Sequence, residues 1–318
     1  MAKPIIEPIE RYGLSKRNRK RTLFSRIGVV GCGKEGSVIA TTAALNGMEV
    51  VFLEPSKEKI ANAYSRIEGK LDKKIENWGL TENEKKAIMG RILGTTDYQD
   101  FDGCDFVIEA VRYDEHTGER RVNHRREVFE KLEKVLASNA IIATNVSTVV
   151  LTNLAAELEY KERCIGLHFL SNVPESQIIE IVRGLYTSDE TFDKVCQFAK
   201  LINHQYISVI ESAGLVSIRL FLIQLNEACS ILMEGISTVE DIDKVLTVGF
   251  GHRQGVFRIA DQMGIEKIVK LLENLFEEYG NMKYKPSPIL LRLSRAKHFG
   301  VSRSKGFYNY DESGNIIK

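Results

Sequence analysis

The stretch "RIGVVGCGKEGSVIATTAALNGMEVVFLEPS", residues 26–56, decides the fold of this chain. A short aliphatic run ends at Gly31, a helix-like segment follows, and a second aliphatic run ends at Glu54. Glycines at 31, 33 and 36 between a strand and a helix, with an acid after the second strand, form the pattern that dinucleotide-binding folds require. The alternative is a glycine-rich turn followed by an unrelated acid.

Each glycine of this pattern has a physical role. Gly31 permits the tight turn, Gly33 removes the side chain that would block a pyrophosphate, and Gly36 lets helix and strand pack closely. The free N–H groups of the helix would then face the phosphates. Glu54 would accept hydrogen bonds from the ribose hydroxyls and repel a 2′-phosphate, and no arginine follows it closely. We therefore expect NAD rather than NADP as the cofactor.

Aliphatic strands continue to alternate with helical segments beyond this stretch. The expected strands are residues 105–111, 140–147, 164–169 and 177–182. This alternation predicts an α/β fold with a Rossmann-type, mostly parallel sheet over residues 26–212 and helices on both faces. Because ligands bind at the carboxyl ends of such strands, Glu109, Ser147 and His168 are expected to converge on one crevice.

Two helical regions accompany the sheet. Residues 56–92, rich in lysine and glutamate, predict a helical hairpin inserted after the second strand. Its Lys70, Lys73 and Lys74 would either bind an anionic group or form a solvated helix face. Residues 213–318 predict an all-helical domain for substrate binding and dimerisation.

This second domain begins with "GLVSIRLFLIQLNEACSILMEGI", residues 214–236, which predicts one long, mostly apolar helix. Thr238 and Asp241 then have capping-box spacing, and residues 264–280 carry an apolar stripe. A helix as apolar as 214–235 must be buried nearly all round. In a domain of about 100 residues that burial requires a second subunit, so we expect a homodimer.

The composition is typical of a globular protein. The 318 residues include 43% hydrophobic and 27% charged residues, with a formal net charge of +1. The apolar runs fall short of the roughly 18 residues that a membrane span needs, so we expect a soluble, cytoplasmic protein. Five cysteines occur singly inside apolar runs, which predicts reduced, buried thiols and neither a metal site nor disulfides.

The charge is uneven along the chain. Residues 1–26 carry eight lysines and arginines against two glutamates. Such an arm could touch nucleic acid or a membrane surface. We expect residues 1–25 to be a flexible, solvated arm instead, without a nucleic-acid or membrane partner.

A carboxylate lies inside the apolar run "QIIEIV", residues 177–182. A buried carboxylate without a partner costs several kcal/mol or shifts its pKa until it is neutral. Glu180 therefore needs a partner, and His168 at the end of the preceding apolar run is the nearest candidate. The alternative is a satisfied core histidine with an unrelated strand glutamate.

Over residues 26–318 the chain resembles the L-3-hydroxyacyl-CoA dehydrogenase family, which includes 3-hydroxybutyryl-CoA dehydrogenases. The resemblance rests on several motifs in the same order: "VVGCGKEGSVIA", "DFVIEAV", "TNVS", "GLHFLSNVP", "IIEIV", "TVEDIDKVLTVGFG", "GVFRIADQMG" and "KGFYNYDESG".

The resemblance implies a dimer that interconverts a 3-hydroxyacyl-CoA and its 3-ketoacyl-CoA with NAD. By position, His168 resembles the family's general base and Glu180 the carboxylate that orients it. Ser147 matches a serine near the substrate hydroxyl, or it caps the next helix. Glu109 would bind the cofactor, or it is a strand-end carboxylate near the cofactor without a chemical role. Arg125 stands where a lysine of the family approaches the cofactor.

The chain departs from the family pattern in three places. Ser171 replaces an asparagine in the turn after His168. Ile218 replaces the family's active-site asparagine, and its side chain cannot hydrogen-bond a substrate oxygen. The loop that starts at residue 112 is about seven residues longer than the family's, which would reshape substrate access.

We therefore expect an NAD-dependent 3-hydroxyacyl-CoA dehydrogenase. His168, Glu180 and Ser147 would be catalytic, and Ser171, Ile218 and the lysines at 70, 73 and 74 would contact substrate. One alternative is a dehydrogenase of a free 3-hydroxy acid in the same superfamily. The other is an NAD-binding dimer that has lost catalysis.

Overall fold

The computed structural model describes residues 24–111, 122–170 and 176–317. Within them an eight-stranded sheet has the order β3-β2-β1-β4-β5-β6-β7-β8. Its strands are β1 (Arg26–Val30), β2 (Glu49–Leu53), β3 (Ile92–Thr95), β4 (Phe106–Glu109), β5 (Ile141–Thr144), β6 (Cys164–Phe169), β7 (Ile178–Arg183) and β8 (Gln205–Ile210).

The pairing of these strands is parallel except between β6 and β7, which run antiparallel. The predicted mostly parallel sheet is therefore confirmed. The sequence prediction missed two of its strands, β3 and β8. β8 has the sequence "QYISVI" and only one buried residue, Val209, so it lacks the continuous aliphatic run that marked its neighbours.

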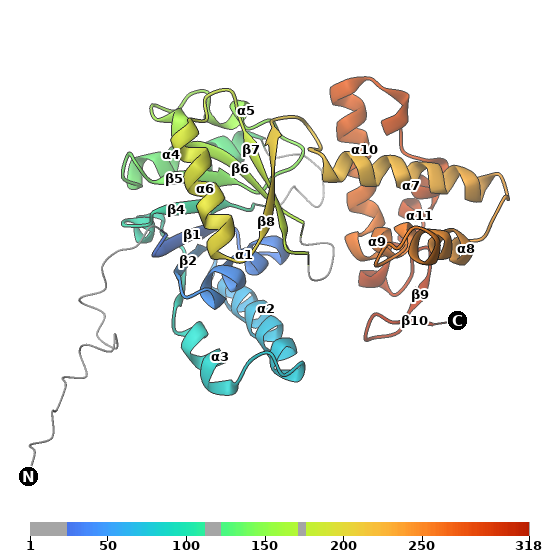
Figure 1. The fold of residues 1–318 in the computed structure, drawn as a ribbon, viewed down its shortest axis with the longest axis horizontal. Coiled ribbons are helices and arrows are strands. Elements are labelled where there is room, and N and C mark those ends of the chain that lie inside the picture. The colour runs from blue at the N-terminus through green and yellow to red at the C-terminus, as the bar shows by residue number, and fades with distance from the viewer. Residues whose placement is uncertain (1–23, 112–121, 171–175, 318) are drawn as a thin grey trace, which may run out of the picture.

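Helices cover both faces of the sheet, as Figure 1 shows. They are α1 (Lys34–Leu45), α2 (Lys57–Glu76), α3 (Glu82–Met89), α4 (Val122–Val135), α5 (Thr152–Ala155) and α6 (Asp189–Leu201). In β1, Ile27 and Val29 enter the apolar cluster on one face, and Val30 enters the cluster on the other. This alternation follows from the two-residue period of a strand, and it buries aliphatic residues on both sides.

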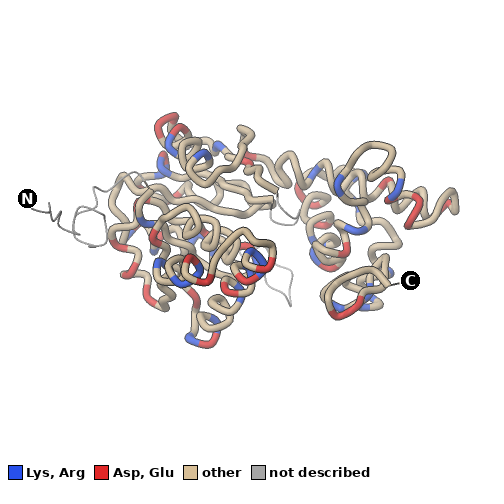
Figure 2. Tube along the Cα trace, turned by 60° about the horizontal axis from the view of Figure 1, so that its bottom comes forward, with Lys and Arg blue, Asp and Glu red and all other residues tan. Residues whose placement is uncertain are grey.

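The helical hairpin predicted for residues 56–92 corresponds to α2 and α3. Ser56 caps α2 by accepting a hydrogen bond from Lys59 N, and Thr81 with Glu84 forms a capping box on α3. The hairpin projects away from the sheet in Figure 1. Figure 2 shows that acidic and basic residues are intermixed along it.

The rest of the described chain is mainly helical and forms the other half of Figure 1. It contains α7 (Ser217–Met233), α8 (Val239–Lys244), the π-helix η4 (Val245–Gly249), α9 (Val256–Met263), α10 (Ile265–Tyr279) and α11 (Pro288–Arg295). Thr238 caps α8 by accepting a hydrogen bond from Asp241 N at 3.2 Å, as the spacing predicted. A small antiparallel pair, β9 (Asn309–Tyr310) and β10 (Ile316–Ile317), was not predicted.

Two sequence expectations need correction. The arm predicted for residues 1–25 does not include its last two residues, because Phe24 is buried and Ser25 N donates to Asp105 Oδ2 at 3.1 Å. The first 23 residues lie outside the described part. The helix at 214–235 is shorter and not buried all round in the single chain, since Leu220 is 67% exposed and Met233 53% exposed.

Candidate functional site

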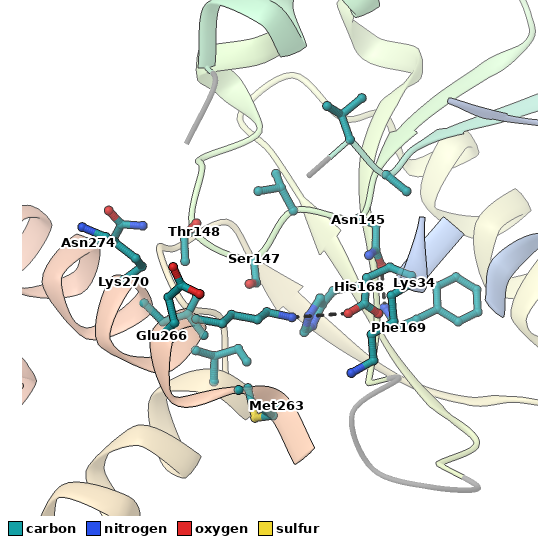
Figure 3. A pocket seen from close by; sticks show the side chains of 18 of the residues that line it. Lys34, Asn145, Ser147, Thr148, His168, Phe169, Met263, Glu266, Lys270 and Asn274 are labelled. Carbon is teal, nitrogen blue, oxygen red and sulfur yellow. Dashed lines mark hydrogen bonds and ion pairs between the residues drawn. The ribbon is translucent and has the colours of Figure 1, made fainter. Parts of the chain in front are cut away.

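A cavity of about 460 Å³ lies at the carboxyl ends of the central strands, as expected for a sheet of this type. One wall comes from the segments after β4 and β5, the end of β6 and the start of α1. The opposite wall comes from α7 and the corner between α9 and α10. In Figure 3, His168 and Ser147 belong to the sheet wall, and Lys270 and Asn274 belong to the helical wall.

His168 and Glu180 form a pair beside this cavity, as the sequence predicted. They are register partners on the antiparallel strands β6 and β7. His168 Nδ1 lies 2.6 Å from Glu180 Oε2, and both residues are buried. His168 lines the cavity, so a histidine oriented by a carboxylate faces the space where a ligand would bind.

Glu180 is held by more than the histidine. The start of α7 supplies three further donors: Val216 N at 3.0 Å, Ser217 N at 2.9 Å and the Ser217 hydroxyl at 2.7 Å. Burial alone would raise the pKa of Glu180, but the hydrogen bonds from His168 and Ser217 outweigh it and lower that pKa. The carboxylate therefore stays charged beside the imidazole. Sequence reasoning missed Ser217, which had no motif to mark it.

The glycine loop fits a dinucleotide pyrophosphate. Gly31 has φ +86°, which disfavours any side chain, and a Cβ on Gly36 would lie 2.0 Å from the Gly31 carbonyl oxygen. Gly33 is the N-cap residue of α1 and makes no side-chain cap hydrogen bond. The first N–H groups of α1 are thus not engaged by a capping side chain, and they lie where phosphate oxygens would accept from them.

Glu54 lies at the end of β2, as expected, and contacts the same loop. Its Oε1 accepts a hydrogen bond from Cys32 N at 2.6 Å. Cys32 is fully buried, and this burial, with the nearby Glu54 charge, raises the pKa of its thiol to about 12. The acid thus stabilises the glycine loop from the end of β2.

Glu109 and Arg125 form a buried ion pair at the end of β4. Glu109 also accepts hydrogen bonds from Val111 N and from the Thr144 hydroxyl, both at 2.6 Å. The Arg125 guanidinium donates to the Val111 carbonyl as well. Arg125 lines the cavity, whereas Glu109 acts from behind it by fixing the arginine and the strand end.

Ser147 and Ile218 lie on the same cavity as His168. The carbonyl of Ser147 accepts a hydrogen bond from Gly214 N at 2.6 Å, which ties the loop after β5 to the start of α7. Ile218 is 7% exposed, so the position that differs from the family faces the site and is nearly buried.

The predicted contacts on α2, Lys70, Lys73 and Lys74, do not line the cavity. Lys73 and Lys74 are exposed on α2 and do not line it. Lys70 is half-buried near the glycine loop; burial lowers its pKa, and the attraction of Glu35 opposes this shift. Ser171 and most of the long loop after residue 111 lie outside the described residues.

The structure adds cavity residues that sequence reasoning did not find. They are Lys34, Glu35, Thr148, Glu266, Lys267, Lys270 and Asn274. Lys34 and Glu35 could have been found from the sequence, because they are charged residues inside the glycine loop. Lys267 and Lys270 could not, because their position depends on how the helical half packs against the sheet.

Residues 24–111, 122–170 and 176–317 contain no group of three or more histidine, cysteine, aspartate or glutamate side chains suited to a metal ion. In the same ranges, no helix has both the length and the apolar character needed to span a membrane. The five cysteines are buried and free.

Comparison with known families gives two matches that together span most of the chain. The family model for the NAD binding domain of 3-hydroxyacyl-CoA dehydrogenase matches residues 26–212. The model for the C-terminal domain of 3-hydroxyacyl-CoA dehydrogenase matches residues 214–310.

Individual relatives and solved structures are also similar to this chain over most of its length. A probable 3-hydroxybutyryl-CoA dehydrogenase of Deinococcus radiodurans is 34% identical over 285 residues, covering 90% of this chain and 100% of the relative. The crystal structure of Mycobacterium tuberculosis FadB2 has a TM-score of 0.85 at 32% identity, and (S)-3-hydroxybutyryl-CoA dehydrogenase PaaH1 from Ralstonia eutropha has 0.81 at 31%. Each comparison covers 91% of this chain and 100% of the other.

Proposed function

The chain belongs to the 3-hydroxyacyl-CoA dehydrogenase family, and we propose that it transfers a hydride reversibly between NAD and C3 of a 3-hydroxyacyl-CoA. The observation that carries this proposal is the buried His168–Glu180 pair, which opens onto a cavity beside the glycine loop. A base, its counter-charge and a nucleotide site are what the oxidation of a secondary alcohol by NAD requires.

In the oxidation direction, His168 accepts the proton of the substrate hydroxyl. Its Nδ1 is held by Glu180, so Nε2 is the nitrogen left for that proton. The Glu180 carboxylate stabilises the imidazolium that forms. When bound, NAD would supply the hydride acceptor that turns the C3 alcohol into a carbonyl, and Gly31, Gly33, Gly36 and Glu54 would hold it. Ser147 would hydrogen-bond the substrate oxygen from the neighbouring wall.

The cofactor would lie along the carboxyl ends of β1, β2 and β4. Gly31, Gly33 and Gly36 would admit its pyrophosphate, and Glu54 would accept hydrogen bonds from a ribose. The Glu109–Arg125 pair would border the nicotinamide end. We also assign function by region: residues 26–212 would bind NAD, and residues 213–318 would shape the substrate side and the subunit contact.

The experiment is NADH oxidation by the purified chain with acetoacetyl-CoA, beside free acetoacetate. His168→Gln should bind NADH normally and lose at least about a hundredfold in kcat, the usual contribution of a general base. If the native chain binds NADH and reduces neither compound, the dehydrogenase proposal fails and a non-catalytic NAD-binding role replaces it.

The same assay decides between thioester and free acid. Turnover of acetoacetate alone would show a free 3-hydroxy acid enzyme. Lys73→Ala with Lys74→Ala gives an independent comparison, because these exposed lysines can meet only a long anionic substrate. The double variant should raise KM for acetoacetyl-CoA and leave any reaction with acetoacetate unchanged.

Ile218 is the specificity position of this proposal. Its side chain lines the cavity but offers no hydrogen bond to a substrate oxygen. A missing hydrogen bond of this kind is worth roughly 1–3 kcal/mol. Ile218→Asn should therefore raise kcat/KM for acetoacetyl-CoA by about tenfold or more, and an unchanged or lower value would mean that the pocket is adapted to an apolar group here.

A further inference from the structure

The glycine loop contains an acid where an anionic ligand is expected. Glu35 is the second residue of α1 and lines the cavity next to Lys34. A carboxylate in the first turn of a helix interacts well with the helix dipole, but it repels a phosphate that uses the same N-terminus. Without a counter-charge, Glu35 would weaken the binding of a pyrophosphate at this loop.

Lys267 supplies that counter-charge from the other half of the molecule. Its Nζ lies 3.3 Å from Glu35 Oε1, although the two residues are 232 positions apart in the sequence. The side chains are only 28% and 19% exposed, so solvent screens their attraction less than at an open surface. Lys70 on α2 adds a longer-range attraction to Glu35.

A second contact joins the same two elements. Lys34 Nζ donates to the Gln262 carbonyl at 3.4 Å, near the end of α9. The first two residues of α1 therefore both touch the corner between α9 and α10. This corner belongs to the part of the chain matched by the C-terminal family model, whereas α1 belongs to the NAD-binding part.

We propose that Lys267 controls the affinity of the NAD site by neutralising Glu35. The helical half thus completes the electrostatics of a phosphate site that the sheet half builds. This inference rests on NAD as the cofactor and not on the identity of the substrate, so it stands or falls separately from the proposed reaction.

The test is the NADH dissociation constant of the full-length chain, measured from NADH fluorescence at low ionic strength. Lys267→Met leaves a net negative charge beside the pyrophosphate, and it should weaken binding about tenfold. Glu35→Gln leaves a net positive charge, and it should tighten binding a few-fold. The double variant has no net charge at this position, as in the native pair, and its affinity should return to within about twofold of native. Added salt should reduce all of these differences.

The expected order of NADH affinities, with Glu35→Gln tightest and Lys267→Met weakest, distinguishes an electrostatic role of the Glu35–Lys267 pair from a structural one. If the ion pair only holds the two halves together, Lys267→Met and Glu35→Gln should weaken NADH binding alike, which would overturn the proposal. A double variant as weak as Lys267→Met would overturn it too, because the lysine would then act through another group. If Lys267→Met does not fold, Glu35→Gln alone decides by the direction of its effect.

Lys194→Met is the matched control. Lys194 is as exposed as Lys267, pairs with Glu190 of the same helix α6 at 2.7 Å, and does not line the cavity. Its removal should leave NADH affinity within about twofold of native. Thermal melting of each variant in the absence of NADH shows whether the fold is retained.

Discussion

Glu180 is a buried carboxylate that interacts with His168 on β6 and accepts hydrogen bonds from the start of α7. Four donors surround the carboxylate, and those of His168 and Ser217 lower its pKa in spite of burial. An unfolded glutamate titrates near pH 4.3. Because the folded pKa is lower than this, the stabilisation is fully present above about pH 4.3 and is lost as the pH falls through the folded pKa.

The direction of this pKa shift gives a prediction for the stability of Glu180→Gln. The variant should be less stable than native by about 2 kcal/mol at pH 7, because it loses charge-assisted hydrogen bonds. The difference should shrink as the pH falls below about 4.3 and through the lower folded pKa, because the native protein has a carboxylate to protonate here and the variant does not. Urea unfolding across this range measures it. A stability gap that stays constant with pH would contradict the depressed pKa.

Ser217 is the second prediction at the scale of single residues. Its hydroxyl donates to the same carboxylate oxygen that faces His168 Nδ1, so it restrains Glu180 at the atom that orients the base. Ser217→Val removes the hydroxyl, and Ser217→Thr retains it with the same added bulk. We expect Ser217→Val to lower kcat about three- to tenfold with unchanged NADH affinity, and Ser217→Thr to stay near native.

The pH dependence of kcat/KM distinguishes positioning from a packing defect. If Ser217 acts through Glu180, the acid limb of the profile should move in Ser217→Val and not in Ser217→Thr. Equal losses in both variants with unshifted profiles would mean that the added bulk, and not the hydroxyl, matters.

Among the elements, α9 is held at both ends by aspartates. Asp243 on α8 accepts hydrogen bonds from Phe257 N and Arg258 N in the first turn of α9. Asp261 on α9 accepts hydrogen bonds from the C-terminal segment, donated by Phe307 N, Tyr308 N and the Tyr310 hydroxyl. These contacts fix the corner that carries Lys267.

Asp261 is 1% exposed and has little room around it, because a Cβ on Gly306 would lie 2.0 Å from its Oδ1. Asp261→Asn replaces an acceptor oxygen by a donor that would face another donor. We expect a loss of about 2–3 kcal/mol in the free energy of unfolding. Asp193→Asn, on the exposed side of α6, should change it by less than about 0.5 kcal/mol. Similar losses in both variants would contradict this assignment.

The same elements show how far sequence reasoning reaches. The glycine loop, the hairpin at 56–92 and the cap at Thr238 follow from local spacing, so they could be predicted. The His168–Glu180 pair could be predicted because a buried carboxylate requires a partner and the two strands are adjacent. Ser217 and Lys267 could not, since their contacts depend on how α7 and α10 dock onto the sheet. The sequence prediction missed β8 because its exposed polar residues interrupt the aliphatic run that marks the neighbouring strands.

At the scale of the whole molecule, the chain leaves an apolar stripe on α7 uncovered. Val216, Leu220 and Ile223 follow one another at helical spacing and are 42%, 67% and 36% exposed. Further exposed apolar residues follow in the same half: Met233, Ile236, Val245, Val248 and Phe250. Exposed apolar side chains that follow one another at helical spacing on one helix favour a contact site there.

We therefore expect a homodimer whose contact includes α7. Leu220→Glu places a charge on the exposed stripe, away from the cavity, so it should yield monomers that still bind NADH. Leu185→Glu is the matched control, because Leu185 is 73% exposed in the sheet half, between β7 and α6. Light scattering after size exclusion, at tens of micromolar protein, should show dimers for the native chain and the control. A monomeric native chain would refute the dimer, and a dimeric Leu220→Glu would show that the contact does not depend on α7.

Because α7 also supplies the donors that hold Glu180, the monomeric variant should lose turnover more than NADH affinity.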